Sequence, residues 1–373
     1  MATALKVAEK SSSAAHRSRA MNFAYMPVLK WKQGEQLALR NFTPELRAHL
    51  LPLIELIDSK ESGDAGVDAQ IGKFAKELGH AGHAHGAVAL DLSLHSAAAK
   101  ATLKLLKRSA NELEKKSVPL VPVLTPQILA GADAELALLK SFPRAVLRLN
   151  IDLILPEQIE GFATKAIAHV PEVHLLLDMA SIVGTDPQGK WAEASIYVQA
   201  AYDWAKAASI TLAGGSFPYN LMGIKPGTIR VPRVERQVWS TAVKNRTFKS
   251  LRFGDYAVTN PVPLPPIDPK MINPSAAIRY ALQQEWMLIK GTGTRTAGRG
   301  QYNDLCRLLI LEDYYAGEDF CYGDASYHKH AQKGASSGSP MSWRRDATSH
   351  HLELTTRMCL ANDATGVPQG PTR

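Results

Sequence analysis

The most regular feature of the chain is a series of eight short apolar runs, separated by segments with helical patterning. The runs span residues 25–31, 51–57, 87–93, 119–124, 145–150, 173–179, 209–214 and 251–258. Neighbouring positions such as Val28 and Leu29 are both apolar, although they point to opposite faces of a strand. Strands that are buried on both faces and alternate with helices are typical of a parallel (β/α)8 barrel. The pattern therefore predicts an α/β fold of this TIM type.

The segments between the runs carry the signals of helix ends and helix faces. Thr43 followed by Pro44 and Glu45 is typical of a helix N-terminus. Alanine, leucine and lysine dominate residues 96–116, which predicts a long amphipathic helix. Further helices are expected at 156–169, 191–208 and 234–245, so most of the runs are joined by helices.

The pattern changes at Pro261, where the prolines of residues 261–274 cannot continue regular structure. We therefore assign the barrel to 21–260, a proline-rich connection to 261–274 and a C-terminal extension to 275–360. Residues 278–282 and 285–290 flank a Gln-Gln pair and are interpreted as a β-hairpin, with one continuous helix as the alternative. Helices are expected at 301–315, 324–332 and 346–360. This hairpin-plus-helix extension should cap the barrel mouth, since the mouth would otherwise be an open charged cavity.

The two ends of the chain carry no apolar patterning. Residues 1–20 are rich in Ala, Ser, Lys and Arg and lack the apolar segment of a secretory signal, so they are expected to form a disordered leader. An organellar transit peptide, or a native start at Met21, are the alternatives. Residues 361–373 are expected to be a disordered tail.

The composition gives only limited information about the compartment and the binding partners of the protein. A formal net charge of +8 permits a polyanionic partner without requiring one. The three cysteines, Cys306, Cys321 and Cys359, are odd in number and form no CxxC pair, which argues against a disulfide framework and favours a reducing cytoplasm. No run of about 18 apolar residues is present, so no membrane partner is expected.

Four motifs follow one another along the chain. They are Tyr25-Met26-Pro27-Val28-Leu29-Lys30-Trp31-Lys32-Gln33-Gly34-Glu35, then Leu51-Pro52-Leu53-Ile54-Glu55-Leu56, then Ile278-Arg279-Tyr280 with Trp286, and finally Ser342-Trp343-Arg344 with His350-His351. In these motifs and their order the chain resembles the beta protein family, first described from T-even bacteriophages and also found in bacterial genomes. The resemblance runs from about residue 25 to residue 360. It implies a phage-related or phage-defence setting and no particular reaction.

Charged residues stand at the carboxyl ends of several predicted strands, the end that carries the active site in barrels of this type. Glu55, Asp91 and Asp178 could hold Mg²⁺ or Mn²⁺ through carboxylate oxygens, with waters completing the shell. The alternative is an internal ion network that only stabilises the barrel. The candidates for the mouth, catalytic or ligand-binding, are Lys30, Glu55, Asp91, Arg148 with Asn150, Asp178 and Asp255.

Further segments could bind phosphate. Ser216, after Gly214 and Gly215, follows the seventh strand, where barrels of this type often bind phosphate; a tight turn is the alternative. From the C-terminal extension, Arg279 and Arg344 could neutralise phosphate charge, and His350 could act as a general acid or base. Adjacent histidines on a helix point about 100° apart, so at most one of His350 and the residue after it faces a given site. A helix that simply docks on the barrel is the alternative.

These observations leave several functions open. Basic residues interleaved with aromatic ones in the C-terminal third are typical of single-strand binding, although no recognised nucleic-acid motif is present. The leading hypothesis is a protein that acts on a phosphate-bearing ligand, a nucleotide or nucleic acid, with metal-dependent phosphoester chemistry if it is an enzyme. The alternatives are a non-enzymatic binding protein that pairs with a protein partner, and a small-molecule lyase or hydrolase. A mouth whose carboxylates all pair with Lys30 or Arg148 would favour the binding scaffold.

Overall fold

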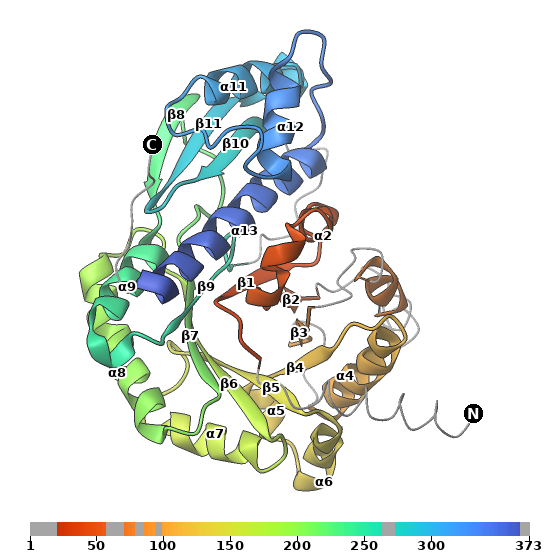
Figure 1. Ribbon diagram of the computed structural model, residues 1–373, viewed down its shortest axis with the longest axis vertical. Helices are drawn as coiled ribbons and strands as arrows, with labels where there is room; N and C mark the ends of the chain where they lie inside the picture. Colours follow the sequence, from red (N-terminus) through yellow and green to blue (C-terminus); the bar gives the residue numbers. More distant parts are fainter. Residues whose placement is uncertain (1–20, 57–70, 79–85, 94–98, 263–272, 366–373) are drawn as a thin grey trace.

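The computed structural model describes residues 21–56, 71–78, 86–93, 99–262 and 273–365 (Figure 1). Eight parallel strands close into a barrel, and each overlaps one of the eight apolar runs, which confirms the predicted (β/α)8 fold. In order around the barrel they are β1 (Tyr25–Lys30), β2 (Leu53–Glu55), β3 (Val88–Asp91), β4 (Leu120–Leu124), β5 (Arg144–Asn150), β6 (Glu172–Ser181), β7 (Ser209–Gly215) and β9 (Arg252–Asp255).

Helices and short 3₁₀ helices surround this barrel (Figure 1). They are α2 (Gln33–Arg40), η1 (Pro44–His49), α4 (Ala99–Glu114), α5 (Pro126–Leu129), α6 (Asp133–Leu136), η2 (Ala137–Ser141), α7 (Gln158–Ile167), α8 (Pro187–Trp204), α9 (Val234–Lys244) and η3 (Arg246–Phe248). The predicted helices at 96–116, 156–169, 191–208 and 234–245 correspond to α4, α7, α8 and α9. Among the described helices, none is long and apolar enough to cross a membrane.

The alternation of side chains along each strand builds two apolar layers. Met26, Val28 and Leu176 belong to the cluster that fills the barrel interior. Their neighbours Leu29 and Leu177 belong to the cluster between the barrel and its helices. Most positions of such a strand are thus buried whichever face they point to, which explains why the runs are apolar on both faces.

Beyond the barrel, the C-terminal extension is built on a three-stranded sheet. The predicted hairpin is confirmed: β10 (Ser275–Ala281) pairs antiparallel with β11 (Glu285–Gly293). A third strand, β8 (Gly227–Pro232), leaves the barrel segment between β7 and α9 and pairs with the other edge of β11. The sequence did not predict β8, because its residues alternate between exposed and half-buried positions and form no apolar run.

Helices complete this extension, here called the cap. They are α10 (Thr294–Ala297), α11 (Gln301–Ile310), α12 (Tyr322–Ala331) and α13 (Pro340–Thr365). The last one begins six residues before the predicted helix 346–360 and ends five residues after it. It crosses between the barrel and the cap sheet in Figure 1 and packs against α2 and β10. The predicted leader 1–20, and residues 263–272 and 366–373 of the predicted connection and tail, lie outside the described residues.

Two glycines allow other helices to approach α13 closely. A Cβ at Gly34 of α2 would lie 2.7 Å from Cγ of Arg344 and 3.2 Å from the amide nitrogen of Arg345. A Cβ at Gly323 of α12 would overlap the backbone oxygen of Asp346 and lie 3.0 Å from the amide nitrogen of His350. Backbone atoms cannot move aside as a flexible side chain can, so the crossing of α12 and α13 requires glycine at position 323.

Gly323→Ala should therefore destabilise the protein by about 2 kcal/mol or more, because the added methyl group forces two helix backbones apart. The matched control is Gly161→Ala in α7, where a Cβ would meet no atom within 4 Å. That change should be neutral or stabilise by up to about 1 kcal/mol through helix propensity. The free energy of unfolding in urea measures both. Equal values for the two variants would contradict the proposed close crossing.

Candidate functional site

Three carboxylates from three strands converge on Arg148, which projects from β5 at the carboxyl end of the barrel. Nη1 of Arg148 donates to Glu55 Oε1 at 2.9 Å and to Asp91 Oδ2 at 2.6 Å. Its Nε donates to Asp178 Oδ2 at 2.9 Å, and its Nη2 lies 2.6 Å from the hydroxyl of Tyr256. The Tyr256 hydroxyl also donates to Asp178 Oδ2 at 2.6 Å. The structure thus brings together four of the seven residues that the sequence placed at the barrel mouth.

The aspartates of the mouth are held in a fixed orientation by their own backbone. In Asp91, Asp178 and Asp255, Oδ1 accepts the amide hydrogen of the residue two positions later, at 2.8, 2.8 and 2.9 Å. Near the end of β6 and just after β9 that residue is an alanine with a left-handed backbone, Ala180 at φ +49° and Ala257 at φ +46°. These Asx turns engage Oδ1. In Asp91 and Asp178 they leave Oδ2 for Arg148 across the barrel.

The charges of this cluster are strongly coupled. Burial raises the pKa of Glu55, and Arg148 opposes that rise. Burial would lower the pKa of Arg148, but Tyr256 and the surrounding carboxylates raise it well above its usual value. Each of the three carboxylates predicted as metal ligands therefore already has a cationic partner. A Mg²⁺ or Mn²⁺ ion bound by Glu55, Asp91 and Asp178 would have to displace that guanidinium, so this metal site stays a prediction.

Two further cations, one from the barrel and one from the cap, bind to the same loop. Lys30, at the end of β1, donates to the backbone oxygens of Asn260 and Pro261 at 2.9 and 3.2 Å. Arg279 of β10 donates to the backbone oxygen of Val258 at 2.8 Å. The loop that follows β9 is thus the place where the mouth and the cap meet.

Arg344 of α13 completes this group, which we call the cationic trio of Lys30, Arg279 and Arg344. Its Nη1 lies 3.2 Å from Oε1 of the buried Glu35, and its side chain is 27% exposed. Burial, followed by the charge of Arg344, lowers the pKa of Arg279 to about 9. Burial also lowers the pKa of Lys30, which Glu55 partly offsets. Among the described residues, no carboxylate forms an ion pair with Lys30 or Arg279.

A second buried network joins α13 to the end of β9. Asp255 Oδ2 lies 2.8 Å from His351 Nε2 and 3.1 Å from Arg233 Nη2. Its Oδ1 accepts a hydrogen bond of 2.5 Å from the Tyr25 hydroxyl. The indole of Trp286 stacks on His351 at 4.9 Å and lies 5.1 Å from the Arg233 guanidinium carbon. Burial would raise the pKa of Asp255, but His351 and Arg233 instead lower it to about 2.

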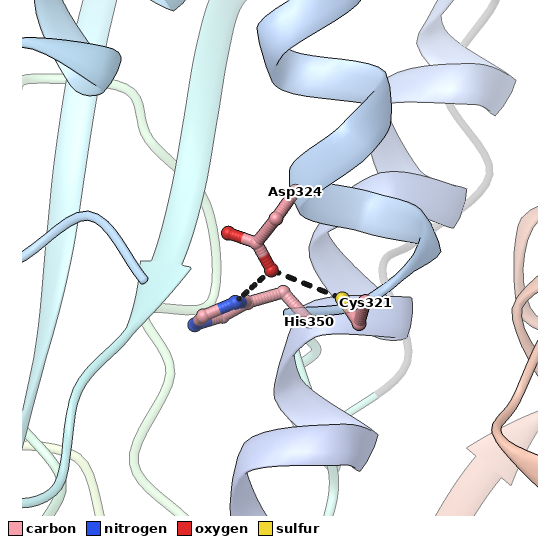
Figure 2. A group of neighbouring side chains, drawn as sticks. All are labelled: Cys321, Asp324 and His350. Atoms are coloured by element: carbon pink, nitrogen blue, oxygen red, sulfur yellow. Dashed lines mark hydrogen bonds and ion pairs between the residues drawn. The ribbon is translucent and has the colours of Figure 1, made fainter. Parts of the chain in front are cut away.

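His350 lies in the cap and not in the mouth. Its Nδ1 lies 2.7 Å from Asp324 Oδ2 (Figure 2). Its Nε2 lies 2.9 Å from the backbone oxygen of Ala281. The same Oδ2 accepts a hydrogen bond from the Cys321 thiol at 3.0 Å, and the Tyr280 hydroxyl donates to Oδ1 at 2.8 Å. Within the part of the chain that the structure describes, Cys321, Asp324 and His350 are the only set of three metal-ligating side chains close enough to share an ion.

One protein-family model matches both the barrel and most of the cap. A model described as "Beta protein" matches residues 25–357, which covers β1 through most of α13. The chain belongs to the beta protein family. No curated protein matches it.

In this family member, Ser216 is buried and hydrogen-bonded inside the fold. Gly214 and Gly215 end β7, and the Ser216 hydroxyl donates to the backbone oxygen of Pro232 at 3.1 Å and to the carboxylate of Glu235. It also accepts the amide hydrogen of Val234 at 3.1 Å, which places it at the start of α9. The hydroxyl that was predicted to bind phosphate thus bonds to the first residue of α9 instead.

The sequence did not single out the residues that hold the two networks together. Tyr25 and Tyr256 lie inside apolar strand runs, where an aromatic residue is expected for packing alone. Arg233 follows β8, a strand that was not predicted. Helix geometry predicts that His350 and His351 face different sites, and the structure agrees, since His350 bonds to Asp324 and His351 to Asp255. Nothing in the sequence indicated that His351, and not His350, faces the mouth.

Arg148→Met should destabilise the protein by about 3–5 kcal/mol, since it leaves three buried carboxylates without their shared cation. The control is Arg230→Met, which removes an exposed ion pair with Glu285 and should cost about 0–1 kcal/mol. Urea unfolding at neutral pH measures both. A small loss in Arg148→Met would mean that the carboxylates are protonated or reach water, and the cluster would then not be an ion network.

Asp255 should make the protein sensitive to acid in a defined window. Its folded pKa of about 2 lies below the value of about 3.9 for an unfolded aspartate. Its contribution to stability is therefore complete above about pH 4 and disappears as the pH falls toward 2, a loss of about 2–3 kcal/mol. Asp255→Asn should be less stable at neutral pH but show a shallower decline between pH 4 and pH 2. Parallel wild-type and variant curves would contradict the assignment.

Proposed function

We propose that this protein binds a phosphate-bearing ligand, a nucleotide or the backbone of a nucleic acid, between the barrel mouth and the cap. The ligand's phosphate would contact the cationic trio of Lys30, Arg279 and Arg344. The observation that carries the proposal is Arg279. Its guanidinium is largely enclosed, stacks over the Phe217 ring at 4.8 Å and bonds to a backbone carbonyl. It has no carboxylate partner among the described residues.

The lowered pKa values of Arg279 and Lys30 support this proposal in energetic terms. A cation whose pKa is lowered is held in an environment that disfavours its charge. A bound phosphate would supply the missing negative charge and would accept hydrogen bonds from the free edge of the guanidinium. Arg344 stands close enough to Lys30 to lower the pKa of its amine, so one bound anion could offset the charge of both cations.

The mouth separates its charges instead of carrying an excess of one sign. Apart from Asp255, which pairs with Arg233, four cations stand against four carboxylates, so their formal charges cancel. The cationic trio lies toward the cap, while the carboxylates, except one that pairs with Arg344, lie on the barrel floor around Arg148. The groups are Lys30, Arg148, Arg279 and Arg344 against Glu35, Glu55, Asp91 and Asp178. This segregation favours a ligand whose anionic end faces the cap and whose polar, uncharged end faces the carboxylates.

Binding is favoured over phosphoester chemistry because every candidate metal ligand of the mouth is paired with Arg148. Metal-dependent catalysis by Glu55, Asp91 and Asp178 with Mg²⁺ or Mn²⁺ is the second candidate. It would require these carboxylates to leave Arg148 and move together around the ion, and Lys30 would then contact the reacting phosphate. His350 has no part in either version, since it bonds inside the cap. The family resemblance supports a phage-related or phage-defence setting, in which the protein would be a binding component with a protein partner.

The first test is calorimetric titration of the full chain with inorganic pyrophosphate and with nucleoside triphosphates. Loss of one charge-assisted contact in Arg279→Gln or Arg344→Gln should weaken binding by about 10- to 100-fold. Arg299→Gln, which removes an exposed arginine of the cap, is the matched control and should bind as the wild type does. Absence of binding, or equal weakening in the control, would overturn the proposal.

A second measurement separates the two candidates. The protein is incubated with end-labelled single- and double-stranded DNA and RNA, with and without Mg²⁺ or Mn²⁺. A salt-sensitive shift without cleavage supports binding through the cationic trio. Metal-dependent cleavage that disappears in Glu55→Ala and Asp178→Ala would instead support catalysis in the mouth.

A further inference from the structure

The cap contains a second site whose chemistry differs from that of the mouth. Cys321 immediately precedes α12, Asp324 lies in its first turn, and His350 projects from α13 (Figure 2). The three ligand atoms all lie within 4.8 Å of one another. One thiol sulfur, one imidazole nitrogen and one carboxylate oxygen form the mixed donor set that Zn²⁺ and related borderline-soft ions prefer.

We propose that Cys321 Sγ, Asp324 Oδ2 and His350 Nδ1 bind one divalent metal ion of the Zn²⁺ class, with a water molecule as the fourth ligand. Asp324 and His350 are buried, whereas Cys321 is partly exposed. Three protein ligands plus one solvent position is a common arrangement for this ion.

The groups around the three ligands are those that a metal site requires. A metal-binding histidine usually donates its other ring N–H to a carbonyl or carboxylate, which fixes the ring and the tautomer. His350 makes that bond from Nε2 to the backbone oxygen of Ala281 at 2.9 Å. The Tyr280 hydroxyl holds the other oxygen of Asp324 at 2.8 Å, and the Tyr280 ring stacks on His350 at 3.8 Å. Both ligands are thus oriented from outside the site.

The hydrogen bonds among the ligands mark the place that the metal would take. Asp324 Oδ2 bonds at the same time to His350 Nδ1 at 2.7 Å and to Cys321 Sγ at 3.0 Å. Each of these two hydrogen atoms lies between a pair of ligand atoms. Metal binding breaks the N–H and S–H bonds, forms the metal–nitrogen and metal–sulfur bonds, and releases both protons to solvent. Tetrahedral bonds of about 2.0–2.3 Å require ligand separations of roughly 3.3–3.6 Å, so the pairs must open by about half an ångström.

The backbone supports this geometry. Gly323, between Cys321 and Asp324 in sequence, lets α12 cross α13 in backbone contact. This close crossing holds the backbone segments that carry the three ligands next to one another. The donor set also distinguishes this site from the mouth, where oxygen ligands alone would suit Mg²⁺ or Mn²⁺.

The test measures metal binding by the full chain after it has been stripped of metal by a chelator and dialysed. Zn²⁺ is titrated in competition with a chromophoric chelator, and Co²⁺ is added separately for absorption spectroscopy. Cys321→Ser is the decisive variant, because its hydroxyl retains the hydrogen bond to Asp324 but is a poor ligand for Zn²⁺. Cys306→Ser, at a buried cysteine elsewhere in the cap, is the matched control.

The wild type should bind one equivalent of Zn²⁺, and its Co²⁺ form should show the near-ultraviolet charge-transfer band of a thiolate ligand. Cys321→Ser should lose that band and bind Zn²⁺ more than about 100-fold more weakly, while Cys306→Ser should match the wild type. Tyr280→Phe, which removes only the hydroxyl that orients Asp324, should weaken binding by about 10- to 100-fold.

Three results would overturn the proposal. They are less than one equivalent of Zn²⁺ in the wild type, a Co²⁺ form without the thiolate band, or equal affinity in Cys321→Ser and the wild type. In any of these cases the three side chains are a hydrogen-bonded cluster that only joins α12 to α13. The Co²⁺ spectrum of the wild type decides the question even if a variant fails to fold.

Discussion

The structure of the barrel mouth depends on one guanidinium. Arg148 is the common partner of carboxylates that arrive from β2, β3 and β6, and it contacts Tyr256 beyond the end of β9. Moving any one of these carboxylates from water into the mouth carries a large desolvation cost, which only a close cation and further hydrogen bonds can offset. The Asx turns supply those further bonds. The side chains of the mouth are therefore held in place by contacts within the barrel, without a ligand or the cap.

The cap adds a second constraint through two adjacent residues of α13. His351 bonds to Asp255 at the end of the barrel, and His350 bonds to Asp324 in the cap. Because successive helical residues point about 100° apart, one helix can join both networks only if it passes between barrel and cap in this register. A rotation of α13 that favoured one histidine would break the contacts of the other. The barrel network and the cap network therefore both depend on the same position and rotation of α13.

Most of the fold could be predicted from the sequence, because apolar residues on both faces of a strand are a local signal. The sequence also predicted that the charged residues at the strand ends would lie together, because the carboxyl ends of parallel strands in a closed barrel surround one mouth. These residues are Glu55, Asp91, Asp178 and Arg148. What could not be predicted was the pairing. Glu55 and Arg148 are 93 positions apart, and the sequence does not indicate whether such charges meet each other, a metal or water. Strand β8 was missed for a related reason, because its pairing with β11 leaves it too exposed to produce an apolar run.

The alternation of one strand links the two proposed sites. In β10, Arg279 and Tyr280 are neighbours, so their side chains point to opposite faces of the cap sheet. Arg279 reaches the loop after β9 and the cationic trio, whereas Tyr280 lies in the apolar core of the cap against His350 and Asp324. Ala281 then supplies the carbonyl that fixes His350. Three consecutive residues therefore contribute to the proposed anion site on one side of the sheet and to the proposed metal site on the other. A change in the position of β10 would alter both, which gives a physical reason for the cap to be built on this strand.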